Sequence, residues 1–269
     1  MTGTGHAGIG YDCRDRVARI TLRDGDRGNA FTVDMAAALF DAVRAAERDD
    51  AAVLILRAEG RFFSVGGDLS GFAGAADLPE TMDDLTSQAH RIIGHLNRSD
   101  LIVISAVRGT AAGIGFPLAM AADLVVAAET ARFTLGYTRV GLTGDGGTGL
   151  LSRSLGLHRT LRLALLNDVL DADEAYAMGL LARVVPAAEL DSRVAELAAG
   201  LATGSRGAQA GIKRVIRAAA QPDAETQLAL EARTMTAATR DPDVLEGVSA
   251  FLAKRPPRFG GTTLPDDAV

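Results

Sequence analysis

Two glycine-rich turns are the parts of this sequence whose residue types and spacing could do chemistry. Residues 60–69 read Gly-Arg-Phe-Phe-Ser-Val-Gly-Gly-Asp-Leu, and a second turn lies around Gly113 and Gly115. Glycine lets a ligand approach the main chain closely, and free amides at a helix start suit an anion or an oxygen that becomes one. If the two turns meet, they form a two-donor oxyanion hole, with the amide of Gly67 as one donor.

Both turns follow apolar runs that predict buried strands, at residues 52–57 and 101–107. Alternating strand and helix patterns up to about residue 157 predict an α/β fold with a mostly parallel sheet, covered by helices on both faces. Thereafter helical patterns prevail, apart from a strand signal at residues 182–185. The small, polar segment 71–78 is predicted to be a mobile loop, and a helix is predicted to open at Gly146. Further strands are predicted at 17–22, 123–128 and 132–135, and further helices at 33–48, after Thr32 as N-cap, and at 81–96.

The composition excludes some classes of function. The net charge of −6 disfavours a nucleic-acid partner, because binding phosphates needs a basic face. No apolar run approaches the roughly 20 residues of a membrane helix, and no signal-peptide pattern precedes Gly10, so we expect no membrane contact and a cytoplasmic location. Cys13 is the only cysteine, and the spacing of the histidines predicts no metal site.

Six motifs in a fixed order connect this chain to a known family. The chain resembles the crotonase family, also called the enoyl-CoA hydratase/isomerase family, from about Arg19 to Phe259. The resemblance implies a crotonase-like ββα superhelical core. The motifs are Phe-Ser-Val-Gly-Gly-Asp-Leu at 63–69, the Gly113 turn, and the stretches 122–127, 140–148, 175–186 and 251–256.

The resemblance implies that the amides of Gly67 and Ile114 stabilise the oxygen of a thioester enolate. Hydratase-type members carry two glutamates that activate water, one after the second glycine turn and one in the next motif. Pro117 and Tyr137 stand at those positions here. Since neither side chain is a carboxylate, a standard two-glutamate hydration is disfavoured.

Asp145 lies in a Gly-Leu-x-x-Asp-Gly-Gly pattern at residues 141–147. The pattern is similar to that of phenylacetate-pathway and other Δ3,Δ2-enoyl-CoA isomerases, whose aspartate shuttles a proton between carbons. Asp145 is therefore the candidate catalytic residue. The alternative is that Asp145 caps the helix predicted after it, a position that favours aspartate.

His90 supports a competing hypothesis. Its spacing before the Gly113 turn is similar to that of the histidine base of 4-chlorobenzoyl-CoA dehalogenases, whose nucleophile is an aspartate in the Asp145 region. Those relatives surround the aromatic ring with aromatic side chains, whereas this chain has no tryptophan and has Ala89 beside His90. A surface or pocket-lining histidine is therefore the favoured interpretation.

The resemblance also implies a bent coenzyme A near the first glycine turn, as part of the substrate and with no redox cofactor. The stretch at 144–149 fits G-x-G-x-x-G, but it comes too late for a dinucleotide-binding βα unit. Lys254 and Phe251 are expected to reach the ADP part from a neighbouring subunit. The candidate coenzyme A contacts are Arg27, Ala30, Arg61, Phe63, Val65, Gly67, Asp68, Phe251 and Lys254.

We expect residues 1–200 to form the α/β core with the acyl-CoA site, and residues 201–269 to form a helical oligomerisation part with a disordered tail. The family's usual assembly implies a homotrimer or a hexamer of two trimers. The favoured activity is an enoyl-CoA isomerase. The alternatives are a hydratase without the glutamate pair, a dehalogenase-like enzyme or thioester hydrolase, and a non-catalytic acyl-CoA-binding protein.

Overall fold

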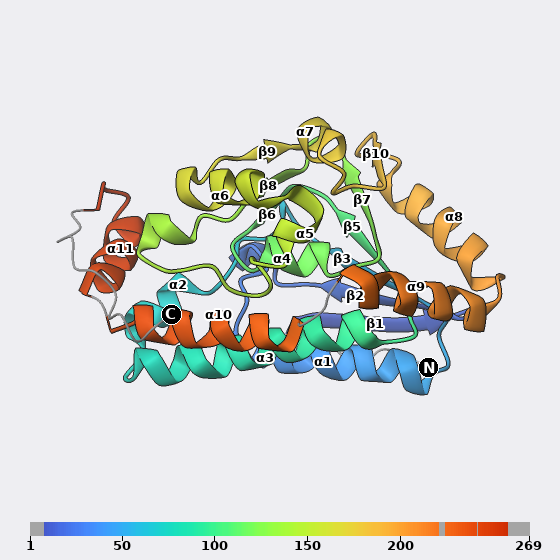
Figure 1. Ribbon diagram of the computed structural model, residues 1–269, viewed down its shortest axis with the longest axis horizontal. Coiled ribbons are helices and arrows are strands. Elements are labelled where there is room, and N and C mark those ends of the chain that lie inside the picture. The colour runs from blue at the N-terminus through green and yellow to red at the C-terminus, as the bar shows by residue number, and fades with distance from the viewer. Residues whose placement is uncertain (1–7, 221–223, 241, 258–269) are drawn as a thin grey trace.

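A computed structural model describes residues 8–220, 224–240 and 242–257 of the 269-residue chain. Two sheets form its centre, and helices surround them (Figure 1). The prediction of a disordered tail concerns residues 260–269, which lie outside the described residues. No helix in the described part of the chain combines the length and apolar character needed to cross a membrane.

The larger sheet has six strands in the order β1-β2-β3-β5-β7-β10. The β1–β2 pair is antiparallel, and the other neighbours are parallel, as predicted for an α/β fold. The strands are β1 (Ile9–Arg14), β2 (Val17–Leu22), β3 (Val53–Ala58), β5 (Ile102–Val107), β7 (Leu124–Ala128) and β10 (Arg183–Val185).

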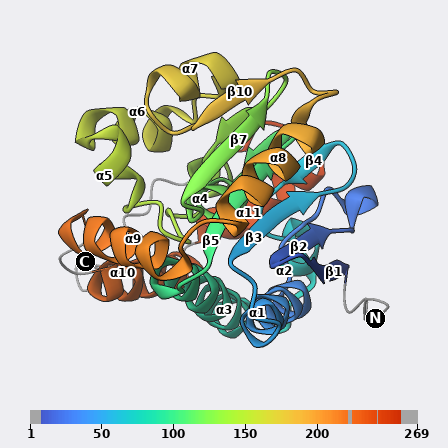
Figure 2. The same ribbon diagram turned by 90° about the vertical axis from the view of Figure 1, so that its right-hand side faces the viewer.

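Alternate residues of the buried strands face two separate apolar layers, because successive side chains point to opposite faces of a sheet. In β3, Leu54 and Leu56 join the main core, whereas Val53 and Ile55 join a second cluster. Helices α1 (Val33–Arg48) and α3 (Leu78–Arg98) belong to the main core, and α8 (Leu190–Ala202) covers the other face. Figure 2 shows the sheet between these helices.

The smaller sheet has the strand order β4-β6-β8-β9. Its strands β4, β6 and β8 directly follow β3, β5 and β7 of the larger sheet along the chain. Its β4 and β6 carry the chain into the two glycine turns. Sequence patterns missed three of its strands, which are only two or three residues long. The strands are β4 (Phe62–Ser64), β6 (Thr110–Ala112), β8 (Arg132–Thr134) and β9 (Leu170–Asp171).

The helix caps follow from the sequence. The Thr32 side chain accepts a hydrogen bond from the Met35 amide and starts α1 where predicted. Asp77 does the same for α3 through the Glu80 amide. The predicted mobile loop at 71–78 is wrong: α2 (Leu69–Gly74) occupies its first half, and buried Phe72 ties this helix to the core.

The C-terminal helices pack against the core of their own chain. Helix α10 lies along α3, and α11 contacts both α2 and the 3-10 helix η2 (Tyr137–Val140) (Figure 1). The remaining elements are η1 (Gly25–Arg27), α4 (Gly115–Met120), α5 (Leu151–Leu155), α6 (Leu157–Leu166), α7 (Ala172–Ala177), α9 (Arg206–Ala220), α10 (Ala224–Ala238) and α11 (Pro242–Leu252).

Candidate active site

The two glycine turns meet. A Cβ built on Gly66 would lie 3.1 Å from the Ala112 oxygen and 3.3 Å from the Cα of Gly113. Gly66 and Gly113 also have φ angles of +97° and +52°, in the region that favours glycine. The glycines therefore allow two main-chain segments to touch without side chains between them.

The amides of Gly67 and Ile114 are available at this junction. Phe31 pairs with the turn through Gly66 O and the Asp68 amide, a pattern that leaves the Gly67 amide unused. Ile114 precedes the first residue of α4, where an amide has no partner inside the helix. Within residues 8–220, 224–240 and 242–257, neither amide has a recorded acceptor. Both can therefore donate to a ligand oxygen.

Buried polar side chains support the first turn. Asn29, which has no exposed surface, donates to the carbonyl oxygens of Glu59 and Phe62 at 2.9 Å each and accepts from the Asp24 amide. The Ser64 hydroxyl donates to Asn29 O and accepts from the Gly66 amide. These bonds fix the turn relative to η1 and β3.

A histidine and two carboxylates form a second group, which adjoins Ile114 through the turn at Gly146. The Nε2 atom of His90, on α3, is 2.6 Å from Oδ1 of Asp145, and their side chains are 12% and 8% exposed. His90 is thus a largely buried partner of Asp145, and of the expected surface or pocket-lining positions the surface one is wrong. Glu231 of α10, which sequence analysis did not single out, is 6% exposed and completes the group.

Asp145 does not cap a helix. Helix α5 begins at Leu151, later than predicted, and the recorded contact of the Asp145 carboxylate is with His90. The main-chain oxygen of Asp145 accepts from the Thr148 amide and hydroxyl. Gly146 follows with a φ of +63°, and a Cβ there would lie 1.7 Å from Cδ1 of Ile114. The turn therefore holds the carboxylate beside the oxyanion turn.

Burial alone would lower the pKa of His90, but the hydrogen bond and charge of Asp145, with the charge of Glu231, outweigh it and raise this pKa. When Nε2 of His90 carries a proton, it donates to Oδ1 of Asp145. Burial and the charges of Asp145 and Glu231 also raise the pKa of Tyr137 well above its ordinary value. The Tyr137 phenol therefore stays neutral and donates to the Asp145 main-chain oxygen at 3.2 Å.

His90, Asp145 and Glu231 are the one group of three in the described ranges whose ligand atoms, within 4.8 Å of one another, could hold a metal. Their atoms already serve as hydrogen-bonding groups. Oδ1 of Asp145 faces His90, and both Glu231 oxygens accept main-chain amides at 2.7 Å. A metal would have to replace these bonds, so the absence of a metal site stays our prediction.

Comparison with known proteins identifies the family. The sequence profile described as enoyl-CoA hydratase/isomerase matches residues 12–262. The chain belongs to this family.

Two relatives of this crotonase-family chain are named for different activities. It is 37% identical over 254 residues to a "probable enoyl-CoA hydratase" of Rhodobacter capsulatus, covering 94% of this chain and 98% of the relative. It is 38% identical over 252 residues to the 1,2-epoxyphenylacetyl-CoA isomerase of Escherichia coli, covering 91% and 95%. The solved structure of an enoyl-CoA hydratase from Mycobacterium avium subsp. paratuberculosis is 32% identical, with a TM-score of 0.87 over 95% of this chain and 99% of that chain. The predicted crotonase fold is confirmed.

In this crotonase, other residues stand at the positions of the two hydratase glutamates. Pro117 is buried in α4 and lines a cavity of about 560 Å³ that reaches the back of the turn at Gly146 and Gly147. Tyr137 lies in η2 and bonds to the main chain of Asp145. Neither position contributes a carboxylate to the site.

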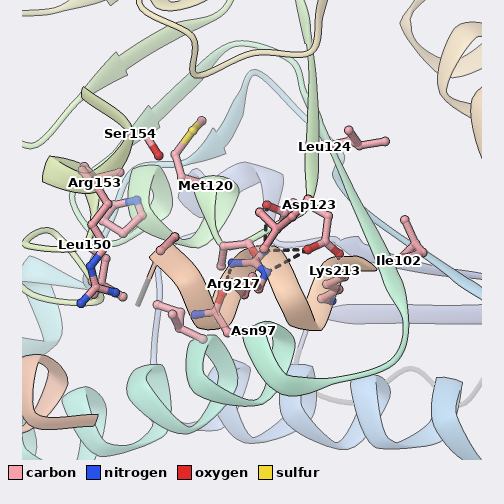
Figure 3. A pocket seen from close by; sticks show the side chains of 18 of the residues that line it. Asn97, Ile102, Met120, Asp123, Leu124, Leu150, Arg153, Ser154, Lys213 and Arg217 are labelled. Atoms are coloured by element: carbon pink, nitrogen blue, oxygen red, sulfur yellow. Dashed lines mark hydrogen bonds and ion pairs between the residues drawn. The ribbon is translucent and has the colours of Figure 1, made fainter. Parts of the chain in front are cut away.

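The same cavity contains a network of charges beneath α9 (Figure 3). Asp123 accepts from Lys213 at 2.8 Å and from Arg217 at 2.7 Å, and Lys213 also donates to Leu96 O and Leu101 O. Burial lowers the pKa of Lys213, against the raising effect of Asp123. Because these cations are already engaged, we interpret the network as an anchor for α9.

The predicted coenzyme A contacts divide into exposed and buried residues. Exposed Arg27 donates to Asp68 at 2.6 Å, and exposed Arg61 lies over the Phe62 ring. Val65 is 40% exposed at the first turn. In contrast, Phe63 and Ala30 are buried, so their side chains belong to the protein interior.

Phe251 and Lys254 are exposed at the end of α11, which packs on α2 of its own chain. The structure does not place them with the residues of the first turn that are described above. Their contact with coenzyme A of a neighbouring subunit stays a prediction.

Proposed function

We propose that this family member isomerises the double bond of an enoyl-CoA thioester. The amides of Gly67 and Ile114 bind the thioester oxygen. The Asp145 carboxylate removes a proton from C-2 of a 3-enoyl-CoA and returns a proton at C-4. The product is the 2-enoyl-CoA.

The observation that carries the proposal is the junction between the Asp145 turn and Ile114. Gly146 packs on the Ile114 side chain, so the turn that carries the buried Asp145 carboxylate lies against the residue that supplies one of the two oxyanion amides. Removing a proton beside a thioester carbonyl creates an enolate, whose oxygen needs fixed donors. One such donor is typically worth about 3 to 4 kcal/mol. The base and the donors therefore suit the same transition state.

His90 supports this role by orienting the base. Its 2.6 Å bond engages Oδ1 of Asp145, while Oδ2 has no recorded hydrogen bond to the described residues. The second oxygen can thus transfer the proton. A general acid or base of this kind typically contributes about 10² to 10⁴-fold to the rate.

Hydration is the nearest alternative, and the two curated relatives support it as well as isomerisation. The residue set favours isomerisation. Hydration in the two-glutamate manner needs carboxylates where Pro117 and Tyr137 stand, whereas isomerisation needs one base near the oxyanion amides.

Purified protein should be incubated separately with 3-enoyl-CoA and 2-enoyl-CoA. The products should then be separated by chromatography and identified by mass spectrometry. We expect 3-enoyl-CoA to become 2-enoyl-CoA at unchanged mass. Rapid formation of 3-hydroxyacyl-CoA from 2-enoyl-CoA would overturn the proposal in favour of a hydratase. Tight binding of coenzyme A thioesters without turnover of any would favour a non-catalytic binding protein.

The His90–Asp145 contact also favours a second candidate, covalent substitution on an aromatic acyl-CoA. Asp145 would attack the ring carbon and expel a halide, and His90 would deprotonate the water that cleaves the resulting aryl ester. A single turnover in ¹⁸O-water decides between the two. Label in the Asp145 carboxylate after turnover of 4-chlorobenzoyl-CoA supports substitution, and unlabelled protein with no halide release contradicts it.

An apolar cavity of about 570 Å³ between α2 and α11 supports an acyl substrate. Phe72 forms part of its wall, and the ring of Phe72 also packs on Gly67. The cavity therefore adjoins the oxyanion turn, and we propose that it receives the acyl group. Coenzyme A would lie outside, by exposed Arg27, Arg61 and Val65, and no redox cofactor takes part.

We further propose that the protein assembles as a homotrimer or as two such trimers, with residues 201–269 contributing to the contacts. Exposed apolar side chains on α6 and α9 support this, because burying them between copies is favourable. Light scattering during size-exclusion chromatography should give three or six times the 27.9 kDa chain mass. A monomer would contradict it. The side chains are Leu157, Leu161, Leu165, Leu166, Ile212, Val215 and Ile216.

A further inference from the structure

Glu231 is a buried carboxylate to which the proposed reaction assigns no step. It lies on α10, which packs along α3 (Figure 1). One of its oxygens accepts from the Gly147 amide and the other from the Gly149 amide, each at 2.7 Å. Bonds between a charged acceptor and amides are roughly twice as strong as neutral ones. Glu231 therefore holds the turn that directly follows Asp145.

This turn needs such support because its backbone is unusual. Gly146 and Gly147 are successive residues with φ angles of +63° and +89°. Within the turn the main chain makes i to i+3 bonds, such as Leu150 N to Gly147 O, and helix α5 begins only at Leu151. The two oxygens of Glu231 accept from the Gly147 and Gly149 amides, and residues of the turn itself do not supply these acceptors.

Glu231 also faces the acid/base pair. Its carboxylate belongs to the group whose ligand atoms lie within 4.8 Å of one another, with His90 and Asp145. The charged or titratable groups that act on His90 are Asp145 on the turn and Glu231 on α10. In a buried site a second negative charge stabilises an imidazolium strongly, because solvent screens it little.

We propose that Glu231 is a positioning residue of the acid/base site, which holds the Asp145 turn through two amides and places a second negative charge beside His90. This role adds to the proposed function. Only the expected effect of Glu231 on turnover rests on that function, whereas its effects on His90 and on the turn do not. Without Glu231, His90 would lose one of its two negative neighbours, and the turn would lose both anchors.

Glu231→Gln tests the electrostatic part. It removes the charge and leaves only one oxygen to accept an amide. In histidine-labelled protein, with His90→Gln used to assign the His90 resonance, NMR titration should show the His90 midpoint shifted to lower pH than in the wild type. We expect the isomerase rate to fall by about 10²-fold, the cost of a slightly misplaced reacting group. An unchanged His90 midpoint in folded protein would overturn the proposal.

Glu225→Gln is the matched control, on the same helix. Glu225 is exposed and pairs with exposed Arg98, and its recorded contact does not involve the acid/base site. This variant should keep both the His90 midpoint and the rate of the wild type. If its midpoint shifts as much as that of Glu231→Gln, the effect is one of overall charge and the proposal is wrong.

Glu231→Asp separates charge from position, and it carries the test if Glu231→Gln does not fold. The side chain keeps its charge but is one methylene shorter, so it cannot reach both amides as before. We expect the raised His90 midpoint to persist while turnover falls. Wild-type turnover in Glu231→Asp would contradict the positioning role. If the wild type turns over no enoyl-CoA at all, the proposed function fails, whereas the titrations still decide the role of Glu231.

Discussion

The two halves of the site are built in different ways. The oxyanion half is main chain, from two local turns at Gly67 and Ile114 whose glycines admit close contact. The acid/base half consists of side chains. His90 lies 55 residues before its partner Asp145, and Glu231 accepts a hydrogen bond from the Gly147 amide, 84 residues earlier in the chain. Local sequence therefore encodes each turn of the first half, and pairing of β4 with β6 brings the two turns together. Docking of α3 and α10 creates the second half.

Gly146→Ala should have the largest effect, because Gly146 joins the two halves. The new methyl group would collide with Ile114, and a non-glycine residue at this φ costs about 1 to 3 kcal/mol. We expect a lower melting temperature and a loss of turnover of about 10²-fold or more. Gly200→Ala is the control, since a Cβ there meets nothing within 4 Å. Wild-type rate and stability in Gly146→Ala would show that the halves do not depend on this contact.

Gly67→Ala should disturb the main-chain half alone. A Cβ on Gly67 would lie 2.8 Å from the Phe72 ring, so the turn must shift and its amide with it. The expected fall in kcat is about 10² to 10³-fold, as for the loss of one oxyanion donor. Adding Phe72→Leu should restore part of the rate by removing the collision. No recovery, or no loss in the single variant, would argue against the amide's role.

His90→Gln should disturb only the side-chain half, with an expected fall in kcat of about 10²-fold. Because the pKa of folded His90 is raised, its bond to Asp145 stabilises the protein fully below the ordinary histidine pKa. This contribution is lost as the pH rises through the raised pKa. Urea unfolding across that interval should therefore show a pH-dependent stability in the wild type that His90→Gln lacks. Equal pH dependence in both proteins would contradict this.

Arg27→Ala should have the smallest effect, because it lies outside both halves. Arg27 is 56% exposed, and its pairing with Asp68 is worth at most about 1 kcal/mol. We expect KM for the coenzyme A thioester to rise by up to about fivefold, with kcat unchanged. A fall in kcat at constant KM would place Arg27 in the chemistry.

The difference between the halves also explains what the sequence could predict. Strand β2 and helix α1 have the predicted bounds, because alternation and the Thr32 cap are local signals. The glycine residues likewise indicated the two turns, but whether the turns meet was left as a condition. Family resemblance, not local pattern, singled out Asp145 and suggested His90.

Other features depend on tertiary contacts. Glu231 has no sequence signal, since its role arises only when α10 docks on the Asp145 turn. Helix α2 was predicted as a loop from its small residues, but burial of Phe72 stabilises it. The capping alternative for Asp145 failed because α5 begins six residues later, at Leu151.

The most direct test of the account follows deuterium uptake from ²H₂O into C-2 and C-4 of an enoyl-CoA, with the wild type and Asp145→Asn. The account predicts uptake by the wild type, and a loss of about 10³-fold or more in Asp145→Asn although it still binds the thioester. Uptake by Asp145→Asn at the wild-type rate would show that Asp145 does not move the proton.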